Sequence, residues 1–138
     1  MDRLSRAERS ENMRRIVGKN TAPELTVRKI VTSLGYRYRI HGKLLPGKPD
    51  LVFARARKVI FVHGCFWHLH SAKGCKEARI PKSRVEYWTQ KLRHNCARDK
   101  KQLLELRKQG WKAIVVWECQ TEKSLEKLTA RVREFLNS

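Results

Sequence analysis

The sequence predicts a single α/β domain of 138 residues, with elements in the order helix, helix, three strands, helix, strand, helix. Two observations predict this class. Segments with apolar residues at helical spacing are separated by short apolar or alternating runs that are typical of strands, and Gly or Pro residues divide most of them. The chain also contains no internal repeat, low-complexity tract or linker. A chain of this length buries about two-thirds of its unfolded surface, so its core needs neither disulfides nor metal.

The N-terminal part is expected to contain an arm and two helices. Residues up to about 9 are polar and charged, which predicts a mobile basic arm. Apolar residues within 13–17 have the spacing of a short helix. Thr21-Ala22-Pro23-Glu24 is a capping box with proline in the first turn, so a second helix is predicted to begin there and to end at Gly35.

Three strands are predicted next. Residues 36–40 alternate aromatic or aliphatic side chains with arginine, as a half-buried strand does. The segment 45–49 is a turn rich in Pro and Gly that leads into a strand at 50–53. Residues 59–62 are apolar throughout, which predicts a central strand covered on both faces.

The C-terminal half is predicted to be helix, strand, helix. Ser83 and Glu86 form a second capping box, and the helix that begins there is expected to reach Gly110, with or without a break. Its apolar residues fall within an arc of about 80° at 100° per residue. This stripe contains Val85, Trp88, Leu92, Cys96, Asp99, Leu103 and Leu106. A strand at 113–117 and a closing helix over 125–136 complete the order.

Asp99 lies in the stripe that faces the core. An ionised carboxylate in such a place is costly unless it meets a cation, a metal ion or several hydrogen-bond donors. The position therefore predicts that Asp99 has one of these three kinds of partner.

The charge of the chain indicates a polyanionic partner. There are 32 Lys and Arg against 13 Asp and Glu, a formal net charge of +19. No apolar stretch long enough to span a membrane and no signal peptide is present, which favours a cytoplasmic protein that faces nucleic acid. Four cysteines without a secretion signal fit a reducing compartment. A ribosomal or histone-like protein would share this charge.

One window concentrates the residues that carry chemistry. The chain reads His63-Gly64-Cys65-Phe66-Trp67-His68-Leu69-His70 and then reaches Cys75. Imidazoles transfer protons near neutral pH, and His with Cys are the usual zinc ligands. Phe66 and Trp67 are adjacent in an extended segment, so at least one of them is expected to be exposed. A structural protein has no use for this combination.

The order of elements, with Pro49-Asp50 at the start of a strand in the sheet, resembles the PD-(D/E)XK nuclease fold. This resemblance implies a mixed central sheet flanked by helices. The acidic residue and lysine of that signature are absent from 59–62. With this departure the chain strongly resembles the very short patch repair (Vsr) mismatch endonucleases. The resemblance rests on Asn12-Met13-Arg14, Asn20 to Glu24, Leu45 to Asp50, Val62 to His68, Tyr87-Trp88, Asn95 with Arg98-Asp99, Gly110-Trp111 and Val116 to Cys119.

The resemblance implies a catalytic Mg²⁺ site and its residues. Mg²⁺ takes one or two carboxylates and keeps most of its water. The implied ligands are Asp50 and the main-chain carbonyl of Val62, with His68 as the principal acid/base group, His63 assisting, and Glu24 touching metal-bound water. Glu24 also has a capping role, and Asp50 alternatively serves only as a turn residue.

The resemblance also implies a structural Zn²⁺ held by His70, Cys75, Asp99 and Cys119. Cys65 is the rival of Cys75, because four residues separate His70 from Cys75 where the family usually has fewer. Cys65, Cys96 and Cys119 have an alternative as small buried thiols.

The aromatic wedge of the family matches Phe66, Trp67 and Trp88. An aromatic side chain inserted between base pairs costs less at a mismatch, which would select for mismatched DNA. For Trp88, core packing is the alternative, since it lies in the apolar stripe of its helix.

The functional hypothesis is a Mg²⁺-dependent DNA endonuclease that nicks one strand 5′ of the thymine in T:G mismatches left by deamination of 5-methylcytosine. It implies a functional link to a cytosine-5 DNA methyltransferase, and a bacterial cytoplasmic monomer associated with the nucleoid when bound to DNA. Two alternatives stay open: a restriction or defence nuclease that acts on matched or modified DNA, and a zinc-containing DNA-binding module without catalysis.

Overall fold

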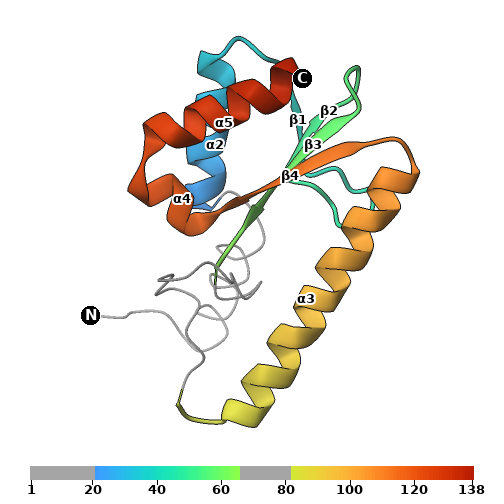
Figure 1. The fold of residues 1–138 in the computed structure, drawn as a ribbon, viewed down its shortest axis with the longest axis vertical. Coiled ribbons are helices and arrows are strands. Elements are labelled where there is room, and N and C mark those ends of the chain that lie inside the picture. The colour runs from blue at the N-terminus through green and yellow to red at the C-terminus, as the bar shows by residue number, and fades with distance from the viewer. Residues whose placement is uncertain (1–20, 66–81) are drawn as a thin grey trace, which may run out of the picture.

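A computed structural model of the chain describes residues 21–65 and 82–138 (Figure 1). The predicted arm and the short helix at 13–17 lie outside these ranges. The described elements are α2 (Ala22–Ser33), β1 (Arg39–Ile40), β2 (Leu51–Phe53), β3 (Lys58–His63), α3 (Val85–Lys108), β4 (Lys112–Trp117), α4 (Glu118–Lys123) and α5 (Leu125–Asn137). Among these elements no helix is both long and apolar enough to cross a bilayer.

The sheet is mixed, as predicted. Its strand order is β1-β2-β3-β4. β1 pairs with β2 and β2 with β3 in antiparallel fashion, whereas β3 and β4 are parallel. The connection between the two parallel strands contains α3, as a crossover between parallel strands requires.

β1 is shorter than predicted. Only Arg39 and Ile40 pair with β2, opposite Val52 and Leu51. Tyr36 and Tyr38 precede the ladder but still pack on the core, so the predicted alternation holds for these two side chains. It fails at Ile40, whose side chain is exposed at the edge of the sheet.

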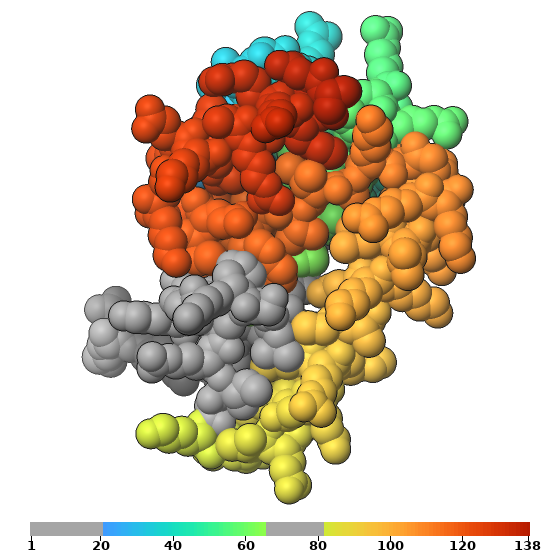
Figure 2. Space-filling view, viewed as in Figure 1, coloured from blue at the N-terminus to red at the C-terminus, as the bar shows by residue number. Residues whose placement is uncertain are grey.

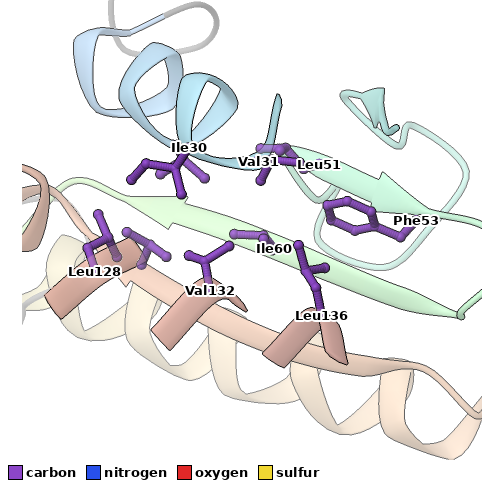
Figure 3. Close-up of a cluster of buried hydrophobic side chains, with 10 residues drawn as sticks. Ile30, Val31, Leu51, Phe53, Ile60, Leu128, Val132 and Leu136 are labelled. Atoms are coloured by element: carbon purple, nitrogen blue, oxygen red, sulfur yellow. The ribbon is translucent and has the colours of Figure 1, made fainter. Parts of the chain in front are cut away.

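β3 is the central strand, and both of its faces are covered, as predicted. Ile60 faces a core shared with α2 and α5, whereas Val59 and Phe61 face a second core under α3. This alternation follows from the two-residue period of a strand. Figure 3 shows the first core, where side chains of α2 and α5 meet those of β2 and β3. The sheet therefore lies between α2 with α5 on one side and α3 on the other (Figure 1).

α2 begins and ends as the sequence predicts. The Thr21 hydroxyl accepts a hydrogen bond from the Glu24 backbone N–H (3.4 Å), which caps the first turn. Gly35 follows the C-cap with φ of +85°, a left-handed conformation that ends the helix. The fourth residue of the capping box is thereby fixed at the start of a buried helix.

α3 runs without a break, but its predicted capping box is wrong. The N-cap is Arg84, in the left-handed region (φ 56°, ψ 44°), and no side chain caps the helix, so Ser83 lies outside the first turn. Leu92 and Leu106 are fully buried, but Val85 is 48% exposed. The helix thus begins one residue later than the capping box requires. Figures 1 and 2 show that its first turns lie beyond the strands of the sheet.

The C-terminal segment contains one more helix than predicted. β4 ends at Trp117, and α4 follows directly over Glu118–Lys123, where no separate helix was expected. The closing helix α5 is confirmed. Ser124 caps it by accepting from the Lys127 N–H (3.3 Å), and Leu128, Val132 and Leu136 are buried.

Candidate active site

Asp50 lies at the start of β2 and is bonded to the central strand. Its Oδ2 accepts a 2.6 Å hydrogen bond from the backbone N–H of Val62 in β3. The preceding loop is held by hydrogen bonds from Gly42 N to Pro49 O (2.9 Å) and from Leu45 N to Gly42 O (3.1 Å). The Pro49 side chain is fully buried. These contacts fix the Asp50 carboxylate at the end of the sheet.

The surroundings of Asp50 favour its protonated form. Burial is the main cause, and together with the charge and hydrogen bond of Glu24 it raises the pKa of Asp50 to about 7 from 3.8. The Val62 N–H and the Arg28 charge act in the opposite direction. Without a metal ion, ionisation of both Asp50 and Glu24 is therefore unfavourable.

Glu24 forms the second carboxylate of the centre. Its side chain is buried, although it belongs to the first turn of α2. Arg28 Nη2 donates to Glu24 Oε2 at 3.1 Å, and His41 Nε2 lies 3.4 Å from the same oxygen. The structure therefore brings together Glu24 and Asp50, which are 26 positions apart along the chain.

Two residues of this cluster were missed from the sequence. Arg28 is four residues after Glu24, a spacing that pairs side chains on one helix face and could have identified it. His41 follows β1 in the left-handed conformation (φ 51°). No sequence signal marks His41, because its contact with Glu24 depends on how β1 and α2 meet.

His63 ends β3 and is 8% exposed. Its ring centroid lies 5.6 Å from that of Phe61 and 5.3 Å from that of Trp117, the residue paired with it on β4. A shallow hollow in this region is lined by His63, Asp99 and Gln102 with Phe61 and Leu103. His63 thus directly follows the residue that donates to Asp50, and aromatic rings restrict its orientation.

The predicted zinc ligands are described only in part. Cys119, at the start of α4, is buried and its backbone N–H donates to the sulfur of Cys65 at 3.4 Å. Asp99 of α3 lines the hollow beside His63 instead of being fully buried. In residues 21–65 and 82–138, no three His, Cys, Asp or Glu side chains are grouped closely enough to hold a metal ion. His70 and Cys75 lie outside these ranges.

Trp88 belongs to neither core cluster of the described residues. It is partly exposed on the second turn of α3, with the ring of Tyr87 at 5.2 Å and Lys91 Nζ 5.9 Å from its own ring centroid. Lys91 also lies 5.8 Å from the ring of Tyr87. Within the described residues Trp88 therefore packs in neither core, and its role stays a prediction.

The remaining predicted site residues, Phe66, Trp67 and His68, lie outside the described ranges, so their relation to Asp50 stays a prediction. The described chain before them is anchored as far as Cys65. This residue is buried and its N–H donates to Glu118 Oε1 at 3.4 Å. The described part of the chain therefore ends two residues after β3, the strand that carries Val62 and His63.

The described centre fits a divalent cation. Two carboxyl groups within hydrogen-bonding reach, one with a pKa raised by burial, gain from a bound positive charge. In an extended strand the N–H and C=O of one residue point toward the same neighbour. The Val62 carbonyl is therefore expected on the side of its N–H, which contacts Asp50.

A mixed α/β sheet with a carboxylate pair at its end is the architecture that the sequence predicts for a phosphodiester-cleaving enzyme. Comparison with known proteins gives the family. The family model for DNA mismatch endonuclease Vsr matches residues 1–74. The chain belongs to this family.

Three relatives support the assignment over nearly the whole chain. The type II nicking enzyme V.XorIIP of Xanthomonas oryzae pv. oryzae is 47% identical over 136 residues, which cover 99% of this chain and 97% of that protein. The type II nicking enzyme V.NmeAIP of Neisseria meningitidis is 43% identical, with 97% and 96% covered. DNA mismatch endonuclease Vsr of Escherichia coli is 38% identical, with 95% and 85% covered.

Proposed function

We propose that this protein is a Mg²⁺-dependent DNA endonuclease that nicks one strand 5′ of the thymine in T:G mismatches that arise from deamination of 5-methylcytosine. The observation that carries the proposal is the buried Asp50 carboxylate, bonded to Val62 in the central strand and next to Glu24. Membership of the mismatch endonuclease family and the names of the nicking relatives support the substrate and the single-strand cut.

In this proposal, Asp50 and the Val62 carbonyl would hold Mg²⁺, and Glu24 would orient water beside them. The ion would offset the negative charge that develops on the phosphate during hydrolysis. His68 moves the proton of the attacking water, and His63 steadies the scissile phosphate. The rings of Phe61 and Trp117 keep the His63 imidazole in one place.

Recognition of the mismatch is assigned to Phe66, Trp67 and Trp88. Trp88 has the features of such a residue: it is partly exposed on a helix that extends beyond the sheet, and Lys91 lies near its ring. Arg84 lies 4.7 Å from the ring of the neighbouring Tyr87. Cations next to exposed aromatic rings suit a surface that meets DNA phosphates and bases together.

A structural Zn²⁺ is proposed on His70, Cys75, Asp99 and Cys119, with Cys65 as the alternative to Cys75. The burial of Cys119 at the junction of β4 and α4 supports a bracing role. The protein is proposed to act as a cytoplasmic monomer, bound to the nucleoid when on DNA, on sites produced by a cytosine-5 DNA methyltransferase.

The test is nicking of a labelled T:G duplex with Mg²⁺ by the wild type and by Asp50→Ala. We expect a cut 5′ of the mismatched thymine with the wild type and none with the variant. Matched and methylated duplexes are tested as substrates in the same experiment. Cleavage of these in preference to T:G would point to a restriction or defence nuclease. Binding without cleavage under any divalent metal would point to a DNA-binding module.

A further inference from the structure

The proposed mechanism leaves Arg28 and His41 without a role, although both contact the carboxylate centre. Arg28 Nη2 lies 3.1 Å from Glu24 Oε2 and 3.5 Å from His41 Nε2. His41 Nε2 is itself 3.4 Å from Glu24 Oε2. Arg28 of α2 and His41, the residue after β1, thus both approach the same oxygen of the Glu24 carboxylate.

His41 joins the two halves of the centre. Its backbone N–H donates to the Asp50 carbonyl at 3.0 Å, while its imidazole lies beside the Glu24 carboxylate. Its φ of 51° is a conformation that costs a non-glycine residue about 1 kcal/mol or more, and such strain persists only where other contacts enforce it. His41 is therefore held at a defined distance from both acidic residues.

Arg28 supplies the positive charge of the cluster. Its side chain is 14% exposed, and that of Glu24 is 4% exposed, so the ion pair is largely shielded from solvent. Burial and Glu24 raise the pKa of Asp50, and the Arg28 charge lowers it, so this guanidinium acts on both carboxyl groups. Within the described chain, its buried Nε has no hydrogen-bond acceptor. A second donor is thus available beside the pair.

We propose that Arg28 and His41 are positioning residues for the Glu24–Asp50 pair, and that the Arg28 guanidinium is its resident counter-cation. The His41 nitrogen accepts from Arg28 in one tautomer and donates to Glu24 in the other, so each form restrains the cluster. Glu24 would then have one orientation before the substrate arrives, which a proton-transfer or water-orienting group requires.

Two experiments test this inference, and only the second, which measures nicking, rests on the proposed function. The first arm therefore needs no substrate and measures unfolding by urea in EDTA. Arg28→Gln should lower the folding equilibrium constant about tenfold in the wild-type background and less than about threefold in a Glu24→Gln background. Lys29→Gln, which removes one positive charge from the next, exposed position of α2, is the matched control and should have little effect.

The second arm measures single-turnover nicking of the T:G duplex. Arg28→Gln should lower the rate at saturating duplex about tenfold or more, with the half-saturating concentration changed less than about twofold. This loss should disappear in the Glu24→Gln background. Arg28→Lys keeps the positive charge but loses the planar guanidinium, so its nicking rate should lie between those of the wild type and Arg28→Gln. If Arg28→Gln does not fold, Arg28→Lys replaces it in both experiments.

Three results would overturn the inference. Additive losses for Arg28 and Glu24 in both arms would mean that Arg28 does not act through Glu24. A weaker affinity with a smaller salt dependence would make Arg28 a phosphate contact instead. An equal loss in Lys29→Gln would reduce the effect to general charge. If the wild type nicks no duplex, the proposed function fails, and the unfolding arm alone decides whether Arg28 and Glu24 are coupled.

Discussion

The Asp50 carboxylate and the Val62 backbone N–H are joined by a 2.6 Å hydrogen bond across two neighbouring strands. This bond fixes an acidic side chain to the C-terminal end of β3, the buried central strand, one residue before His63. It leaves the carboxylate in a buried environment with a second acid nearby. The proposed chemistry depends on this arrangement.

The first prediction concerns pH and stability without metal. The pKa of Asp50 is raised to about 7 in the folded state from 3.8, so the fold binds the proton more tightly than the unfolded chain. The contribution of Asp50 is fully present below about pH 4 and is lost as the pH rises through about 7, by at most about 1.4 kcal/mol per pH unit. Urea unfolding in EDTA should show this slope.

Asp50→Asn should remove that slope, because the amide does not titrate. Glu86→Gln, at an exposed position of α3, is the control and should keep it. A slope that is the same in the Asp50→Asn variant would mean that the burial of Asp50 does not govern the stability of the metal-free protein between pH 4 and 7.

The second prediction compares the roles of Trp88 and Leu92, which lie four residues apart on α3. Leu92 is fully buried, so Leu92→Ala should lower the free energy of unfolding by about 2–5 kcal/mol. Trp88→Ala should cost less stability but weaken binding to a T:G duplex more than to a matched one. Fluorescence anisotropy with both duplexes measures this difference. Equal weakening for the two duplexes would rule out a role for Trp88 in mismatch selection.

Features of the fold that depend on residues close together in the sequence could be predicted, whereas those that depend on tertiary contacts could not. The α2 cap and the covering of β3 on both faces follow from local sequence patterns, and the structure confirms both. The Ser83 capping box failed because the helix begins one residue later, with Arg84 in a left-handed conformation at the N-cap. Local patterns do not report how far a helix extends.

The candidate site shows the same limit. Asp50 was identified from Pro-Asp at a strand start and from the family motif. The structure bonds it to Val62, and its catalytic role stays a prediction. His41 was missed because its meeting with Glu24 is a contact over 17 positions that depends on tertiary packing. His68 and Cys75 stay predictions, since they lie outside the described residues.

The third prediction concerns Lys58, a buried lysine that the sequence analysis did not single out. Its ammonium donates to the carbonyls of Leu136 (3.0 Å) and Ser138 (2.6 Å) at the C-terminal end of α5. Lys58→Met should lower the free energy of unfolding by about 1–3 kcal/mol, because these charge-assisted bonds are lost. Lys112→Met is the control, since Lys112 is the paired residue on β4 but is exposed. Similar losses in both would contradict the assignment.

The fourth prediction concerns zinc. The purified protein should contain about one zinc per chain, as expected of a closed four-ligand site. Cys119→Ser and Cys75→Ser should lose it. Cys96→Ser should keep it, because Cys96 is not one of the proposed ligands. Metal analysis after dialysis measures this. Loss of zinc in Cys65→Ser, but not in Cys75→Ser, would identify Cys65 as the ligand.

The most direct measurement is localised cleavage of the protein backbone by Fe²⁺ in place of Mg²⁺, with ascorbate and peroxide, followed by mass spectrometry of the fragments. Fragments should end near positions 50, 62 and 68, and Asp50→Asn should abolish all of them. Mg²⁺ should compete with the iron. Cleavage confined to the region of Asp99 and Cys119, or a pattern that is unchanged in Asp50→Asn, would contradict a metal centre at Asp50.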